Sequence, residues 1–345
     1  VDEAKIASLH VSKASNDMVV LRGFGKYTWF SRDRGANFIK RDFADFVDLH
    51  LHPTNPQMLL ATKYDGEYPH RELTLYMSED FGETWKKLVA RIRECSWGNA
   101  GKGDEPQSSI YCTIHDAMEK SETFREWDVN LHFYKSIDFF STMDKMVAHG
   151  NRFNFHDNYL FVAAINPDEP TEIVLKVSTD GCKTFHTTQF PYQLTQRSYT
   201  VLDTSEGAVY VQVKPGREFV KEVQHDEESN LYANIYVSGP KGTRYALSLK
   251  RVVKDWRGVA DFENVNGVEG VFIANVADEH LQNTPDIPKR TVITFDKGAF
   301  WQPLTPPEYD SLGRSAVGHC KDCTLHLNGK TSWSFGPVYS SPSST

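Results

Sequence analysis

An eight-residue pattern returns along this chain at intervals that indicate a repeated structural unit. It begins with Ser or Thr, has Asp two positions later and an aromatic residue seven positions later. The clear copies are SRDRGANF, SEDFGETW, STDGCKTF and TFDKGAFW, which begin at residues 31, 78, 178 and 294. Weaker copies begin at residues 136 and 238, and the second of these lacks the Asp. The six starting points are on average about 53 residues apart, a period that is typical of β-propeller blades.

The segments between the copies are short and apolar, as strands are. Examples are MVVLRG at 18–23, YLFVAAI at 159–165 and AVYVQVK at 208–214, each bounded by Gly, Pro, Asn or Asp. No long stretch shows sustained helical periodicity, although residues 114–127 could hold a helical turn or an exposed loop. The sequence therefore predicts an all-β fold, a β-propeller.

The repeated pattern favours a scaffold function over a catalytic one. Ser and Asp side chains in a turn hydrogen-bond to nearby backbone groups, and Gly supplies the positive φ that other residues resist. A catalytic site would not be copied around a ring. The residues expected to have this structural role are Ser31, Asp33, Gly35, Ser78, Asp80, Gly82, Trp85, Asp138, Ser178, Asp180, Asp296, Gly298 and Trp301.

Charge and hydropathy exclude several classes of partner. The formal net charge is −8, and no run of Lys and Arg is present. Nucleic acids and anionic membrane surfaces are therefore not expected as partners. No apolar run approaches the roughly 18 residues that span a bilayer.

The cysteines point to an oxidising compartment. Cys95 and Cys112 bracket a loop rich in Gly, Ser and Pro, which a disulfide would close. Cys320 and Cys323 form CKDC, but the strand-like TLHL follows it where a thioredoxin-type motif needs a helix. No second ligand pair has the spacing of a zinc site. We expect two disulfides, Cys95–Cys112 and Cys320–Cys323, with Cys182 left over.

The repeats resemble Asp-boxes, the S-x-D-x-G-x-x-W hairpins of sialidases and of Vps10-domain (sortilin-type) sorting receptors. Other segments distinguish the two families. VDLHLHPTNPQMLLA at 47–61 and KSIDFFSTM at 135–143 resemble blade openings and boxes of the Vps10 domain. The stretch from 229 to 327, which ends in CKDCTLHL, resembles that domain most specifically. The resemblance covers nearly the whole chain.

This resemblance implies a β-propeller with Asp-box hairpins, the first six to seven blades of a ten-bladed ring. Residues 1–345 would form one incomplete ring of about 6.5 blades. The remaining blades, the cysteine-rich modules, the membrane span and the sorting tail of the family are expected outside this chain.

The implied function is that of a type I membrane receptor that carries a soluble luminal cargo, a peptide or a protein. Transport would run between the Golgi and endosomal or vacuolar compartments, so the chain would lie in their lumen. Neither catalysis nor a cofactor is expected, and the membrane would be met only through the downstream helix. A dimer is among the assemblies that the resemblance allows.

The resemblance also nominates ligand contacts. In mammalian members of the family, an Arg after a strand that ends in Ser-Leu holds the carboxylate of a peptide C-terminus. The match here is SLKR, which gives Arg251, with Phe272 and Ile273 on a neighbouring strand as an apolar pocket. Lys250 or Arg257 could replace Arg251 in this role. Alternatively, Arg251 is a solvated surface residue and Phe272 belongs to the core.

Two rival classes are less well supported. A sialidase-like glycoside hydrolase needs three Arg, the first in an F-R-I-P-like motif, and Arg22 in VVLRGFG lacks the Pro. A cytosolic or organellar assembly factor with a smaller propeller disagrees with the cysteines. His50 and His52 share one face of a strand, as a metal pair would, but a structural role in the HPTNP turn is favoured.

Overall fold

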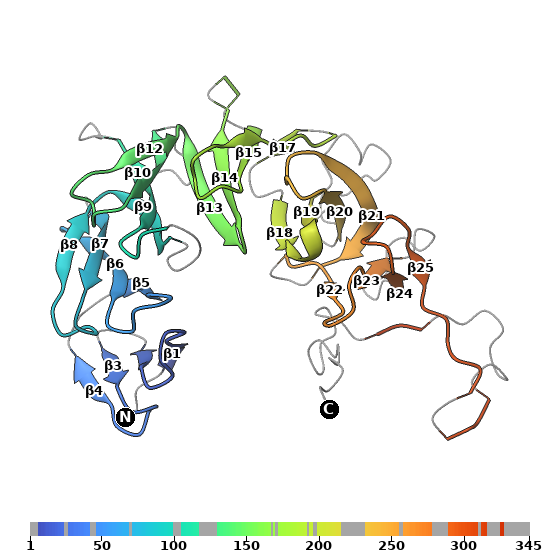
Figure 1. Cartoon of the computed structure of the whole chain (residues 1–345), viewed down its shortest axis with the longest axis horizontal. Helices are drawn as coiled ribbons and strands as arrows, with labels where there is room; N and C mark the ends of the chain where they lie inside the picture. Colours follow the sequence, from blue (N-terminus) through green and yellow to red (C-terminus); the bar gives the residue numbers. More distant parts are fainter. Residues whose placement is uncertain are drawn as a thin grey trace. The chain divides into compact units, whose positions relative to one another are not determined.

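The computed structural model describes an all-β chain (Figure 1). In the part of the chain that it describes, no helix has the length and apolar character needed to cross a bilayer. The described residues are 6–23, 27–41, 46–68, 71–98, 105–116, 130–166, 168–169, 172–191, 193–195, 199–214, 232–254, 258–277, 289–309, 312–315 and 325–327.

The described strands group into six antiparallel meanders of four strands, which we call blades 1 to 6. Blade 1 contains β1 Ile6–Val11, β2 Val19–Gly23, β3 Thr28–Ser31 and β4 Ile39–Arg41. Blade 2 contains β5 Phe46–Leu51, β6 Leu59–Asp65, β7 Glu72–Ser78 and β8 Lys86–Val89. Blade 3 contains β9 Ile92–Trp97, β10 Ile110–His115, β11 Leu131–Ser136 and β12 Asp144–Val147.

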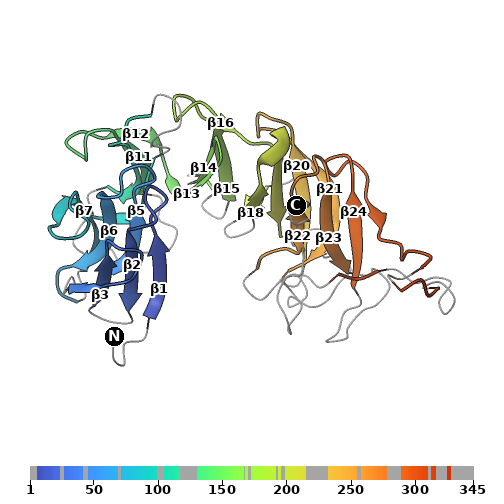
Figure 2. The same cartoon turned by 60° about the horizontal axis from the view of Figure 1, so that its bottom comes forward.

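The later blades repeat this order with local additions (Figure 2). Blade 4 contains β13 Gly150–His156, β14 Tyr159–Ile165, β15 Glu172–Ser178 and β16 His186–Thr187, and β17 Leu194–Thr195 also pairs with β15. Blade 5 contains β18 Tyr199–Asp203, β19 Val209–Val213, β20 Tyr232–Ser238 and β21 Tyr245–Val253, with the 3-10 turn η1 Ser205–Gly207 before β19. Blade 6 contains β22 Phe262–Asn264, β23 Phe272–Ala277, β24 Lys289–Thr294 and β25 Gln302–Pro303.

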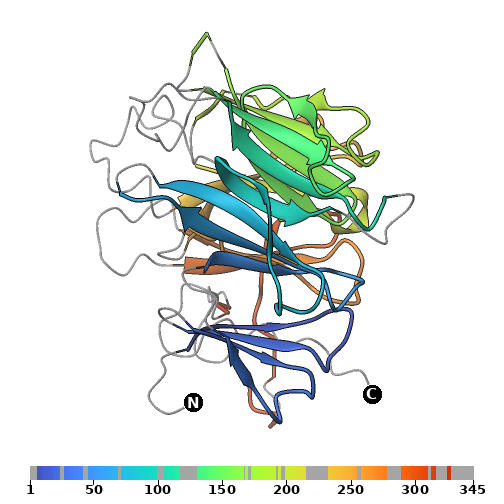
Figure 3. The same cartoon turned by 90° about the vertical axis from the view of Figure 1, so that its left-hand side faces the viewer.

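The chain forms two compact units. The first comprises Val1–Asn154, Phe161–Pro170 and Gly181–Thr184, and the second comprises Phe155–Leu160, Thr171–Asp180 and Phe185–Thr345. In the first unit, the twisted sheets of blades 1 and 2 lie next to each other (Figure 3). In the second unit, blades 5 and 6 form one sheet, joined through the pairing of Val252 with Val276.

The core lies between the faces of consecutive blades. On β6, Leu59 and Ala61 pack with Val20 and Phe30 of blade 1. Leu60, which points to the other face of the same strand, packs with residues of blade 3. Because both faces of such a strand are buried, its sequence is a continuous apolar run rather than an alternating one. This is why the apolar segments are short and uninterrupted.

Every box begins at the last residue of the third strand of its blade. Ser31, Ser78, Ser136, Ser178, Ser238 and Thr294 are the final residues of β3, β7, β11, β15, β20 and β24. The boxes are therefore the turns that lead each blade from its third strand toward its fourth, and the period seen in the sequence is the period of the blades.

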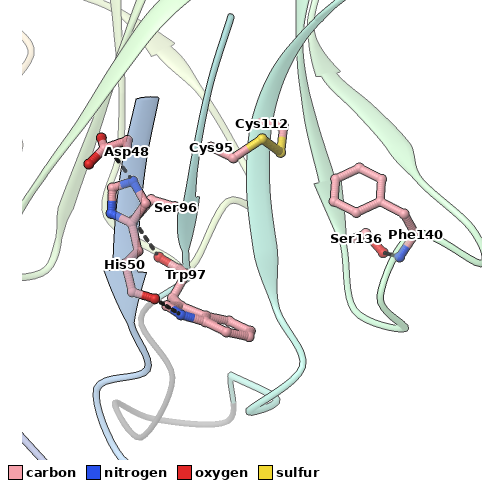
Figure 4. The surroundings of a disulfide bond; sticks show 8 residues. All are labelled: Asp48, His50, Cys95, Ser96, Trp97, Cys112, Ser136 and Phe140. Atoms are coloured by element: carbon pink, nitrogen blue, oxygen red, sulfur yellow. Dashed lines mark hydrogen bonds and ion pairs between the residues drawn. A yellow bond between two sulfur atoms is a disulfide. The ribbon is translucent and has the colours of Figure 1, made fainter. Parts of the chain in front are cut away.

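One of the two expected disulfides is confirmed. Cys95 on β9 and Cys112 on β10 are directly opposite in the antiparallel register and are joined (Figure 4). Both are buried in the core shared by blades 2 and 3. The expected Cys320–Cys323 bridge lies outside the described residues.

The Cys95–Cys112 disulfide links the two strands β9 and β10 that flank the Gly-, Ser- and Pro-rich loop. Replacing both cysteines by Ala should lower the free energy of unfolding by about 3 kcal/mol in the chain-entropy model. Chemical denaturation of the double variant and of the wild type measures this difference. Peptide mapping without reduction should recover the two residues in one linked peptide, and recovery of Cys112 linked to Cys320 would contradict the assignment.

Candidate functional site

The box at 78–85 shows how its residue types close the turn. The Ser78 hydroxyl donates to Asp80 Oδ1 at 2.7 Å and accepts from the amide of Gly82 at 2.7 Å. Asp80 accepts in turn from the amide of Thr84 at 2.9 Å. Two side-chain groups thus satisfy backbone donors that a tight turn would otherwise leave without partners.

The same arrangement recurs in the other boxes that carry an Asp. The hydroxyl-to-Asp distances are 2.7 Å for Ser31–Asp33, 2.9 Å for Ser136–Asp138, 2.8 Å for Ser178–Asp180 and 2.7 Å for Thr294–Asp296. In the box at 238, where Pro240 stands in place of the Asp, the Ser238 hydroxyl donates to the carbonyl of Gly239 instead.

Two consecutive residues of each complete box have positive φ. At the third and fourth positions after the hydroxyl residue, φ is 58° and 82° at Phe81 and Gly82. Glycine is not indispensable at the fourth position, since Phe140 and Cys182 adopt φ values of 63° and 69° there. The cost of such a conformation in a non-glycine residue is modest and is outweighed by the fixed turn around it.

Turn donors lower the pKa values of the box carboxylates Asp33, Asp80, Asp138 and Asp296, which does not suit a proton-transfer role. Hydrogen bonds from Asn37 and Ser31 lower the pKa of Asp33 to about 2. Burial alone would raise the pKa of Asp80, but bonds from the Thr84 hydroxyl and amide and from Ser78 outweigh it and bring that pKa to about 2. The boxes therefore act as structural turns.

Replacing Asp80 with Ala should lower the free energy of unfolding by about 1–2 kcal/mol, because several turn donors lose their acceptor. Since the native pKa of Asp80 is lowered to about 2, this contribution is complete above its unfolded value near 3.8 and is lost as the pH falls toward 2. Denaturation of both proteins between pH 7 and pH 2 tests this. A folded variant that lost ligand binding without losing stability would instead identify the box as a binding site.

The His50 and His52 pair has separate structural partners. His52 is fully buried, and its Nδ1 accepts from the amides of Thr54 and Asn55 at 3.2 and 2.9 Å. Its Nε2 lies 2.8 Å from the carbonyl oxygen of Gln107 in blade 3. His50 contacts Asp48, with Nε2 3.2 Å from Oδ2 (Figure 4). No group of three His, Cys, Asp or Glu among the described residues could hold a metal ion.

His52 should make the fold sensitive to mild acid. Burial lowers its pKa below 6.5, so its stabilising effect is complete above 6.5 and declines as the pH falls toward the native pKa. We expect His52→Asn to cost about 1 kcal/mol at pH 7.5 and less at pH 5, measured by denaturation at both values. The same change at exposed His186 controls for residue type. A cost that grew on acidification would contradict this assignment.

The residues nominated as ligand contacts lie in blades 5 and 6. Arg251 is on β21 with φ of 55°, and its guanidinium carbon is 4.7 Å from the centre of the Tyr232 ring. Ile273 is half-buried on β23. Phe272 is fully buried and stacks on Phe262, with ring centres 5.2 Å apart, so it presents no surface to a ligand.

The register sets Arg251 and Ile273 apart. Because Val252 pairs with Val276, Arg251 lies level with Ala277, four positions along β23 from Ile273. Along the strand this places Arg251 and Ile273 about 13 Å apart at 3.3 Å per residue, and an irregularity in the pairing of β21 next to Arg251 interrupts the alternation of side chains there. A single terminal residue would therefore not contact both. Of the alternatives to Arg251, Lys250 is exposed, and Arg257 lies outside the described residues.

A family model described as Sortilin, neurotensin receptor 3 (Sortilin-Vps10) matches residues 1–345. Curated fungal relatives are named vacuolar protein sorting/targeting protein 10. That of Aspergillus flavus is 27% identical over 346 residues and that of Ajellomyces capsulatus 28% over 366, covering 95% and 99% of this chain. The chain spans 22% and 24% of their lengths.

Solved structures give more distant likenesses. The β-propeller domain of the Trilobed protease from Pyrococcus furiosus has a TM-score of 0.44 at 12% identity, over 89% of this chain and 84% of that one. YCF48 bound to D1 peptide has a TM-score of 0.43 at 12% identity, over 87% and 82%. Neither likeness is close enough to bear on function.

Proposed function

Because the chain belongs to the Sortilin-Vps10 family, we propose that it is the luminal cargo-binding region of a transmembrane sorting receptor. Its cargo is a soluble luminal peptide or protein, which it binds without chemical change. The family match over residues 1–345 carries this proposal. The names of the fungal relatives, which refer to vacuolar sorting and targeting, support transport between the Golgi and endosomal or vacuolar compartments.

The buried Cys95–Cys112 disulfide supports the proposed compartment. Disulfides persist in the oxidising lumen of the secretory pathway and are rare in the cytosol. The formal net charge of −8 supports a protein or peptide partner rather than nucleic acid.

Within this function, Arg251 is the proposed contact for a cargo carboxylate. Its guanidinium is held against the ring of Tyr232, which keeps the planar group in one orientation. The amide of Arg251 donates to Asn234 Oδ1 at 3.2 Å, which also fixes the backbone. A planar guanidinium in a fixed position can bond both oxygens of a carboxylate. Ile273 would meet a cargo residue further along an extended peptide, and Phe272 would support the strand from the core.

Arg251→Met should weaken cargo binding about 10- to 100-fold, the range for a hydrogen-bonded charge pair. Calorimetry on the complete receptor ectodomain, with a peptide from a luminal protein that the wild type captures, measures this. Arg244→Met, a change at an exposed Arg of the same strand region, should leave affinity unchanged.

Amidation of the peptide C-terminus tests the proposed contact at Arg251 independently of the proposed receptor function. If Arg251 holds the terminal carboxylate, amidation should weaken the wild type and have little further effect on Arg251→Met. Capture that is unaffected by Arg251→Met would reject this residue as the contact while leaving the receptor function intact. If cells without the receptor retained all their soluble luminal proteins, the receptor function itself would be rejected.

A further inference from the structure

In three boxes, the backbone amide three positions after the Ser or Thr is bonded to another turn of the same blade, the one between its first and second strands. The amide of Arg34 donates to the carbonyl of Asp17 at 3.0 Å, and that of Phe81 to the carbonyl of Gln57 at 2.8 Å. The amide of Lys297 donates to the carbonyl of Gly270 at 3.0 Å. The three acceptors lie between the first and second strands of blades 1, 2 and 6. The box is thus tied to its own blade by one N–H group.

Carbonyl groups of the same turns are bonded to the preceding blade. Arg32 of blade 1 donates to the carbonyl of Asp80 in the box of blade 2 at 2.8 Å. The Tyr210 hydroxyl of blade 5 donates to the carbonyl of Lys297 in the box of blade 6 at 3.0 Å. Two further pairs repeat this arrangement, Lys135 with the Gly181 carbonyl at 3.3 Å and Tyr159 with the Pro240 carbonyl at 2.7 Å.

Each of these bonds lies within one compact unit. The division of the chain assigns Gly181–Thr184, the box turn of blade 4, to the unit that contains blade 3. Lys135 of blade 3 meets that turn and is also paired with Glu105 at 3.0 Å. Glu105 accepts in addition from the Tyr111 hydroxyl, whose pKa is raised by burial and by the neighbouring Cys182 thiol. The turn therefore packs with the blade before its own.

The fourth position of the box is also shaped by the preceding blade. A Cβ atom on Gly82 would lie 2.6 Å from the Phe30 ring of blade 1, and one on Gly298 would lie 2.6 Å from Ser248 Oγ of blade 5. By contrast, a Cβ atom on Gly35 would meet only Phe38 of its own box, at 3.4 Å. These three glycines have nearly equal φ values, between 82° and 86°.

We infer that the Asp-box turn is a clamp between consecutive blades, and that Arg32, Lys135, Tyr159 and Tyr210 are its positioning residues. In the boxes of blades 2 and 6 the hydroxyl and Asp hold two residues in the left-handed region, so that an amide faces the turn's own blade while a carbonyl faces the preceding one. Opening one turn therefore releases groups on two blades together. The donors can differ in chemical type because guanidinium, ammonium and phenol groups all donate to a backbone carbonyl.

Hydrogen exchange on the full chain tests the clamp. Tyr210→Phe removes one hydroxyl and keeps the ring, so the fold should persist. Exchange should become roughly 2- to 12-fold faster in blade 5 and also in residues 294–301 of blade 6, the range expected for losing one hydrogen bond. Tyr76→Phe is the matched control, since the Tyr76 hydroxyl bonds Asp65 within blade 2. In that variant the faster exchange should stay within blade 2.

Exchange that accelerates in blade 5 alone after Tyr210→Phe would overturn the clamp. A second comparison uses the glycines, because Gly82→Ala and Gly35→Ala share the same backbone strain and differ in the contact with the preceding blade. Gly82→Ala should lower the thermal midpoint by about 1–2 °C more than Gly35→Ala. Equal midpoints would show that the turn serves its own blade only, which also overturns the inference.

Discussion

Burial on both faces of the sheets is the constraint on which this structure depends. Leu59 and Leu60 are adjacent on β6, are fully buried, and contact different neighbouring blades. A four-stranded sheet whose two faces are both apolar cannot be stable alone, because removing one neighbour exposes half of its core. Within the first unit, blades 1, 2 and 3 must therefore be held face to face.

The Asp-box meets this constraint with short-range chemistry. Its hydroxyl and carboxylate satisfy the turn from within, as at Ser78 and Asp80, so the turn needs no solvent to complete its hydrogen bonds. A self-contained turn can then offer its remaining carbonyl groups to another blade. Hydrogen bonds supply direction and the apolar faces supply most of the free energy, since the net gain from each bond is only about 1 kcal/mol.

What could be predicted from the sequence is what local chemistry determines. The spacing of the boxes predicts the strand ends, because Ser, Asp and Gly act within eight residues. The Cys95–Cys112 bridge could also be predicted, since the two cysteines bracket a loop rich in Gly, Ser and Pro. The residues that bond the box carbonyls from the preceding blade could not be predicted. Arg32 and Tyr210 lie far from their acceptors in the sequence, and one is a guanidinium while the other is a phenol. The burial of Phe272 could not be predicted either, because the local sequence does not show whether an apolar side chain on a strand faces the core or a pocket.

The candidate cargo site depends on the same turns, although they contact no part of it. Ser248 on β21, three residues before Arg251, donates to the carbonyl of Gly298 at 2.6 Å and accepts from the indole N–H of Trp301 at 3.0 Å. Both partners belong to the box of blade 6. The strand that carries Arg251 is thus held by the turn of the following blade, and a displacement of that turn would move the guanidinium. If Arg251 is the proposed cargo contact, Trp301 of the box contributes to the geometry of recognition through the strand it fixes rather than through any contact with the ligand.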